Sequence, residues 1–213
     1  MTGLRRYVRP APVAAQRPEP DGPAPRCDLC ATELTDRHGH VVSLDDRALR
    51  CVCRPCSLLF APAGAGGGRI RAVPDRYLSD PAHPITDDDW DLLQIPVLPV
   101  FLFVNSDLDR VVACYPSPAG ATESLLDLDG WTRLQQRYPL LRTPVADVEA
   151  VYVTRGDDGL AAYLVPIDAC FAMVGMLRSN WRGPHGGAEA RRATAAFVRD
   201  LQERSRPLRP ARV

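Results

Sequence analysis

Apolar residues repeat in two patterns along the chain from about residue 69 onward. Short runs that alternate or are continuously apolar predict β-strands, and apolar positions three or four residues apart predict helices. Strands are therefore expected at 69–74, 95–106, 110–116, 148–155 and 160–167. Helices are expected at 86–94, 129–139, 168–181 and 186–206. Because these elements mix without a regular β-α alternation, the sequence predicts an α+β fold.

Local cap and turn residues accompany these patterns. Thr86 is a suitable N-cap for the first helix, and the acidic residues 87–89 fall in its electropositive first turn. Asp129 is the expected cap of the second helix. The GDDG sequence at 156–159 predicts a tight hairpin. One face of the third helix is expected to be apolar, with Ile167, Cys170, Phe171, Val174 and Leu177.

Composition divides the chain into five segments. Residues 1–25 are rich in Pro, Ala and Arg and lack an apolar period, so they are expected to form a disordered leader. The next segment, 26–61, holds most of the cysteines. A glycine-rich linker with a connecting strand is expected at 62–84, and the α+β domain at 85–205. The basic residues 206–213 are expected to be a disordered tail.

The segment RCDLCATELTDRHGHVVSLDDRALRCVCRPCSLLF, at 26–60, contains five of the seven cysteines. Cys27 and Cys30 form one Cys-x2-Cys pair, and Cys53 and Cys56 form a second pair after twenty-two intervening residues. Each pair bends the backbone into a knuckle that directs both sulfurs toward one point, so two pairs supply a tetrahedron of thiolates. The four cysteines are therefore predicted to bind one metal ion.

The residues between the two pairs favour a small zinc-binding fold. HVVSL and ALRCVC can pair as a hairpin across DDR, and PCSLLF can start a helix with Pro55 at its first position. Cys56 would lie in the first turn, where the helix dipole favours a thiolate. Knuckle, hairpin and helix together are typical of treble-clef and zinc-ribbon modules. So short a segment buries little apolar surface, and the ion is expected to supply much of its folding free energy.

Three other residues of this segment are alternative ligands. Cys51 lies two residues before Cys53, so both side chains would point to the same face of a continuous strand. His38 and His40 are the further alternatives. Zn²⁺ is favoured over iron, because neither pair is followed by the glycine that iron-binding rubredoxin knuckles usually carry. Four thiolates leave no coordination position for water, which predicts a structural ion.

Charge and hydropathy narrow the classes of partner. The 26 basic residues are all Arg and balance 26 acidic residues, and residues 26–60 hold five Arg against five Asp or Glu. Nucleic-acid modules normally carry a basic excess, so no nucleic-acid binding is expected. No apolar run approaches the roughly 18 residues of a membrane span. No export signal is recognised either, so we expect no membrane insertion, a cytoplasmic location and reduced thiols.

Outside the cysteine segment, no set of residues predicts an acid, a base and a nucleophile, and no catalytic residue is assigned. Cys114 and Cys170 lie in apolar patterns and are expected to be core residues. YPSPAGATESLL at 115–126 and NWRGPHGG at 180–187 are expected to be loops, and they are the candidate binding surfaces of this part of the chain.

Several segments resemble, in order, an uncharacterised family from bacteria with GC-rich genomes. They are CDLC, RHGHVVSL, CVCRPCSLLF, GGGRIRAVPDR, YPSPAGATESLL and YLVPIDACFAMVGMLRSNW, and the resemblance covers 26–205. Genes of that family lie beside those of nickel–iron uptake hydrogenases. The resemblance implies a non-enzymatic accessory protein whose partner is a hydrogenase subunit or maturation factor. A zinc-ribbon nucleic-acid-binding regulator and a rubredoxin-like electron carrier are the alternatives.

Overall fold

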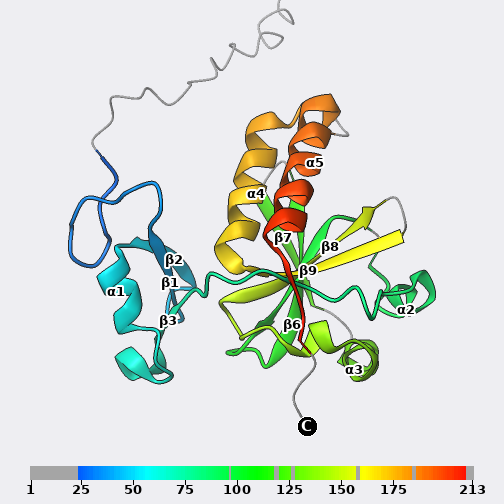
Figure 1. Cartoon of the computed structure of the whole chain (residues 1–213), viewed down its shortest axis with the longest axis horizontal. Coiled ribbons are helices and arrows are strands. Elements are labelled where there is room, and N and C mark those ends of the chain that lie inside the picture. The colour runs from blue at the N-terminus through cyan, green and yellow to red at the C-terminus, as the bar shows by residue number, and fades with distance from the viewer. Residues whose placement is uncertain are drawn as a thin grey trace, which may run out of the picture.

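Two sheets and a few helices make up the chain, as the computed structural model in Figure 1 shows. The structure describes residues 24–95, 97–117, 120–125, 128–156, 159–183 and 186–209. The expected leader lies outside this part of the chain up to residue 23, as does the end of the expected tail from residue 210. The prediction of a mixed α+β fold is confirmed.

The small sheet has the strand order β2-β1-β3. Strands β1 (Gly39–Ser43) and β2 (Ala48–Val52) form the expected antiparallel hairpin. Strand β3 (Ile70–Ala72) pairs with the other edge of β1, after the short 3-10 helix η1 (Ala65–Gly68). The sequence predicts this strand but places it in a connecting segment, whereas in the structure it completes the sheet of the cysteine segment.

The large sheet has the order β10-β4-β9-β8-β5-β6-β7. Its neighbouring strands are antiparallel, except that β10 runs parallel to β4. The strands are β4 (Leu78–Ser79), β5 (Val100–Asn105), β6 (Arg110–Ser117), β7 (Gly120–Leu125), β8 (Glu149–Gly156), β9 (Gly159–Pro166) and β10 (Arg206–Pro207). The sequence assigns the residues of β10 to a disordered tail, but their backbone pairs with β4.

Two strands differ from their predicted extent. Strand β5 begins only at Val100, after Pro99, because a proline has no N–H to donate to the ladder. The YPSPAGATESLL segment is not a loop: it forms the end of β6 and the whole of the edge strand β7. Pro116 is tolerated there because β6 has already passed the end of its pairing with β5. Residues 118, 119, 126 and 127 lie outside the described part of this segment.

The helices follow the predicted pattern with two corrections. They are α1 (Arg54–Leu59), α2 (Asp87–Asp91), α3 (Leu128–Arg137), the 3-10 helix η2 (Pro139–Arg142), α4 (Ile167–Asn180) and α5 (Gly187–Arg204). Helix α3 already includes Leu128, so Asp129 lies in its first turn and is not its cap. On α4 the buried face includes Met173, while Phe171 is exposed. The prediction of Phe171 as a core residue is therefore wrong, since this helix is rotated by a fraction of a turn from the expected orientation.

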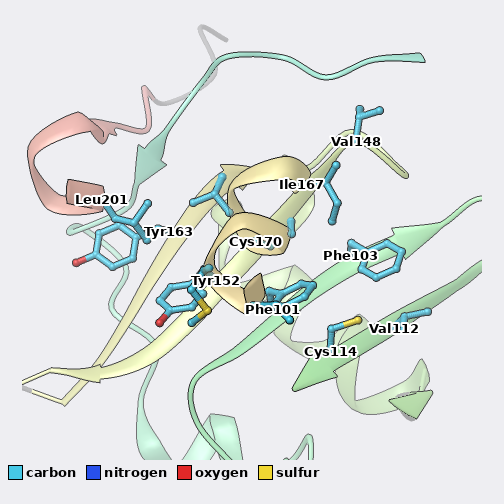
Figure 2. Close-up of a cluster of buried hydrophobic side chains, with 14 of the residues drawn as sticks. Phe101, Phe103, Val112, Cys114, Val148, Tyr152, Tyr163, Ile167, Cys170 and Leu201 are labelled. Carbon is cyan, nitrogen blue, oxygen red and sulfur yellow. The ribbon is translucent and has the colours of Figure 1, made fainter. Parts of the chain in front are cut away.

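Helices cover both faces of the large sheet. Helices α4 and α5 lie side by side over one face, and their buried side chains join those of the sheet strands in one cluster. Figure 2 shows part of this cluster, in which Phe101 and Tyr152 of the sheet lie close to Cys170 of α4. On the other face, Trp90 after the start of α2 and Trp131 of α3 pack in a second cluster.

The small sheet packs against the body at the α4 face. Val42 of β1 belongs to the same buried cluster as Phe103 and Ile167. Arg71 of β3 donates a hydrogen bond of 2.7 Å to Asp147 Oδ2, whose side chain is nearly buried. The two sheets therefore share apolar contacts and a charged contact, which sets the position of β1 relative to α4.

Helix α2 contains a buried carboxylate that makes stability depend on pH. Thr86 caps the helix by accepting from the Asp89 amide, as predicted, and the Asp89 side chain accepts from Tyr138 Oη and from Thr86 Oγ1. The Tyr138 hydrogen bond is the largest cause of a lowered Asp89 pKa, and Arg137 Nη1, 2.5 Å from Asp89 Oδ1, contributes further.

Asp89→Asn is expected to lower the free energy of unfolding at pH 7 by more than it does in acid. The carboxylate's contribution is full above its ordinary pKa of 3.8 and is lost as pH falls through the lowered folded-state pKa. Urea unfolding from pH 7 to pH 2.5 would measure the difference between the two proteins. A difference that grows toward low pH would contradict this assignment. Asp88→Asn, on an exposed neighbouring side chain, is the matched control.

Candidate metal centre

The first cysteine pair lies in a tight turn that precedes the hairpin. The Cys27 amide donates to the Thr32 carbonyl and the Ala31 amide donates to the Cys27 carbonyl, both at 2.8 Å. Ala31 has a left-handed φ of 58°, which is the position where the sequence of an iron-binding knuckle usually has glycine. The turn brings Cys27 and Cys30 to the same side of the backbone, as expected for a Cys-x2-Cys knuckle.

The second pair lies where β2 gives way to α1. Strand β2 ends at Val52, and Cys53 is the N-cap residue of α1. Pro55 takes the second helical position, one residue later than predicted, where its missing N–H costs no hydrogen bond. Cys56 follows in the first turn. Because the backbone turns from strand to helix at Cys53, Cys51 and Cys53 do not lie on one continuous strand.

These turns bring four thiols together. The sulfurs of Cys27, Cys30, Cys53 and Cys56, here called the cysteine tetrad, all lie within 4.8 Å of one another. All four are free cysteines, and Cys30 Sγ lies 3.6 Å from Cys53 Sγ. A tetrahedral ion with metal–sulfur bonds of about 2.3 Å has sulfurs about 3.8 Å apart. The tetrad therefore has the composition and nearly the dimensions of a four-thiolate metal site, and it can hold a metal ion.

The tetrad is partly shielded by a small apolar cluster. Cys27 and Cys56 are buried with Val41, Val52 and Leu34, whereas Cys30 is exposed and Cys53 is half-buried. One side of the site is thus built into the module's core and the other faces solvent. Among the described residues, this is the only buried apolar cluster that the module forms by itself. Loss of the thiolates would disturb its packing.

The pKa values of two of these thiols are shifted in opposite directions. Burial alone would raise the pKa of Cys27, but hydrogen bonds from the amides of Cys53, Leu29 and Cys30 outweigh it and lower the pKa to about 6. A hydrogen bond with the neighbouring sulfur of Cys53, together with burial, raises the pKa of the Cys56 thiol to about 12. Thiolate charge is therefore already favoured at Cys27, and a cation is needed to bring four such charges together.

Thr32 supports the exposed corner of the tetrad. The pKa of Cys30 is lowered, chiefly by a hydrogen bond with the Thr32 hydroxyl, whose Oγ1 lies 3.4 Å from Cys30 Sγ. Sequence reasoning missed Thr32, although its place two residues after a knuckle cysteine is a signal that local geometry could have supplied.

The three alternative ligands form a group of their own. Ligand atoms of His38, His40 and Cys51 also lie within 4.8 Å of one another, and all three side chains are half-buried. Two carboxylates flank this group: Asp28 accepts from the Cys51 amide at 2.7 Å, and Asp168 Oδ2 lies 2.8 Å from His40 Nδ1. Nothing in the sequence pattern indicates either carboxylate, because both depend on how distant segments pack.

A family model described as a family of unknown function (DUF5947) matches residues 26–205. The chain belongs to this family. Comparisons with curated proteins and with solved structures found no match. The match covers the same residues as the resemblance noted in the sequence, so membership of an uncharacterised family is confirmed, while the link to hydrogenases stays a prediction.

The two other candidate binding surfaces are the segments 115–126 and 180–187. The 115–126 segment is a hairpin whose Glu123 lies 3.3 Å from Arg47 at the tip of the small-sheet hairpin. In the 180–187 segment, Trp181 Nε1 donates to the Gly183 carbonyl at 2.9 Å, and residues 184 and 185 lie outside the described part. Among the residues that the structure describes, no helix has the length and apolar character needed to cross a membrane.

Proposed function

We propose that the cysteine tetrad binds one structural Zn²⁺ and that the surrounding segment is a treble-clef or zinc-ribbon-like module. The observation that carries this proposal is the convergence of four free thiols from two knuckles within 4.8 Å. Four thiolates close the coordination shell, so the ion has no position for a reactive water. It stabilises a module that buries little apolar surface without it.

Protein purified under zinc-sufficient conditions should contain zinc. Cys30→Ser and Cys56→Ser should remove the zinc of the tetrad, whereas Cys51→Ser should keep it. The retained zinc is expected because Cys51 lies outside the tetrad. Elemental analysis of the three variants and the wild type measures this. Iron in a visibly coloured protein would instead identify an electron carrier, and metal-free wild-type protein would overturn the proposal.

We infer that this module serves contacts with another protein. Leu58 and Leu59 of α1 are 56% and 67% exposed, and Leu29 between the first two cysteines is 41% exposed. These leucines give the module exposed apolar surface for contact with a protein partner. A rigid metal-bound module would present them in a fixed geometry.

The partner that we propose is a nickel–iron hydrogenase subunit or a factor that matures it. Support comes from the segments in which the chain resembles a hydrogenase-associated family, and a contact surface without assigned catalytic residues is compatible with it. Deleting the gene in the native host should lower hydrogen uptake and subunit maturation without lowering transcript levels. Normal uptake would overturn the proposal, lost transcript would favour a regulator, and a mature but electron-starved enzyme would favour an electron carrier.

Complementation of that strain tests the contact surface. Leu58→Ser with Leu59→Ser should fail to restore hydrogen uptake while the protein keeps its zinc. The matched control is Leu108→Ser, which alters a side chain of similar exposure (47%) in the turn between β5 and β6. Full complementation by the double variant would exclude α1 as the contact surface.

A further inference from the structure

One face of the small-sheet hairpin carries potential metal ligands. His40 and Cys51 are directly opposite each other in the β1–β2 register, so their side chains lie on the same face. His38 precedes His40 by two residues and shares that side of the backbone. Val41 points to the other face, where it packs in the cluster that contains Cys27. The ligand atoms of His38, His40 and Cys51 thus form a group distinct from the tetrad.

Hydrogen bonds hold both imidazoles in the orientation of metal ligands. His38 Nδ1 lies 3.0 Å from the Thr35 carbonyl oxygen, and His40 Nδ1 lies 2.8 Å from Asp168 Oδ2. A carbonyl and a carboxylate both accept, so each Nδ1 donates and each Nε2 keeps a free lone pair. Carboxylate–histidine pairs of this kind are the usual outer shell of a metal site.

An unpartnered polar atom lies within the same group. His38 Nε2 is fully buried from solvent and has no hydrogen-bond partner. A buried acceptor without a partner costs about 1–3 kcal/mol, so native proteins seldom keep one. Since Cys51 and His40 present their ligand atoms within 4.8 Å, a bound cation would satisfy His38 Nε2.

We propose that His38, His40 and Cys51 form a second metal site, which binds Zn²⁺ or a divalent ion of similar ligand preference. Two imidazoles and one thiolate suit such an ion, and they leave a net charge of +1. The carboxylate of Asp168 behind His40 balances that charge. Unlike the tetrad, this site has three protein ligands and therefore a fourth position for water or for one donor atom of an external ligand.

The second site joins the module to the body. Its ligands lie on the module, whereas Asp168 lies in the first turn of α4. An ion at this site would strengthen the His40–Asp168 contact by polarising the imidazole, and would thereby couple metal binding to the packing of β1 against α4.

Full-length protein, reduced and titrated with Zn²⁺ against a chelating indicator, should bind two ions per chain. Cys51→Ser and, separately, His38→Asn should each bind one, and Asp168→Asn should bind two with the weaker site reduced about 10- to 100-fold in affinity. His83→Gln is the matched control, since it removes a histidine that also contacts a carboxylate, Asp80 at 3.0 Å, but belongs to neither ligand group. It should bind two.

The stoichiometries separate this site from the tetrad. The second site is supported if the wild type binds two ions and each of Cys51→Ser and His38→Asn binds one, with unchanged far-ultraviolet circular dichroism. One ion in the wild type that Cys51→Ser retains would overturn the second site and leave the tetrad intact. One ion that Cys51→Ser abolishes would overturn both assignments. Two ions in Cys51→Ser and His38→Asn would also overturn the second site.

Discussion

Replacing Cys30 or Cys56 by Ser is expected to unfold the small sheet and α1 while the α+β body stays folded. The buried cluster of the module consists largely of Val41, Val52, Leu34 and two of the tetrad cysteines, so it cannot persist once the sulfurs no longer converge. Structural zinc contributes on the order of 10 kcal/mol to the folding of small modules, which exceeds what this cluster can supply. The body keeps its two large apolar clusters, one on each face of its sheet.

Amide hydrogen exchange resolves the two parts of the chain. Amides of β1, β2 and α1 should lose protection in either variant, whereas those of β5, β6 and β8 should keep it. Cys51→Ser makes the same chemical change in the same module but leaves the tetrad complete, so the amides of β1 and β2 should keep more protection in it than in either tetrad variant. If protection in β1 and β2 survives both tetrad substitutions, the ion is not what stabilises the module.

Much of the cysteine module could be predicted from the sequence because its geometry is local. A Cys-x2-Cys turn, a hairpin and a helix that starts after a cysteine each depend on a few consecutive residues. The helices and the central strands of the larger body are predicted, since strand and helix periods are visible within short windows, but the strands β4, β7 and β10 are not. The assignment of β3 failed in part because pairing across the glycine-rich segment is a property of the tertiary fold.

The group formed by His38, His40 and Cys51 is not predicted from the sequence. From the sequence alone, Cys51 and Cys53 are alternative ligands of one ion, because they are two residues apart in an expected strand. In the structure, the strand ends between them, and Cys51 is directed to the face that carries His40. Asp168 is more than a hundred residues away, so only the packing of α4 on the small sheet brings it to His40. Contacts of this kind have no signature in a single sequence.

Removing the guanidinium of Arg76 is expected to destabilise the body by about 3 kcal/mol, because it leaves a buried carboxylate unpaired. Glu149 of β8 is fully buried. Its oxygens accept from Arg76 Nε at 2.5 Å and from Arg76 Nη2 at 2.7 Å, and the Val145 amide donates to it at 2.8 Å. Arg76→Ala would keep only the amide contact. Since Arg76 follows β3 in the chain, this pair also ties the segment between the two sheets to the body.

Urea unfolding followed by tryptophan fluorescence measures the change, because Trp90 and Trp131 are buried in the body. Arg69→Ala is the matched control: it removes an arginine from an exposed pair with Asp45 and should cost less than about 1 kcal/mol. Adding Glu149→Gln to Arg76→Ala should recover part of the loss, because the buried group is then neutral and still accepts from the Val145 amide. If Arg76→Ala costs no more than Arg69→Ala, the buried charge of Glu149 is compensated by groups other than Arg76.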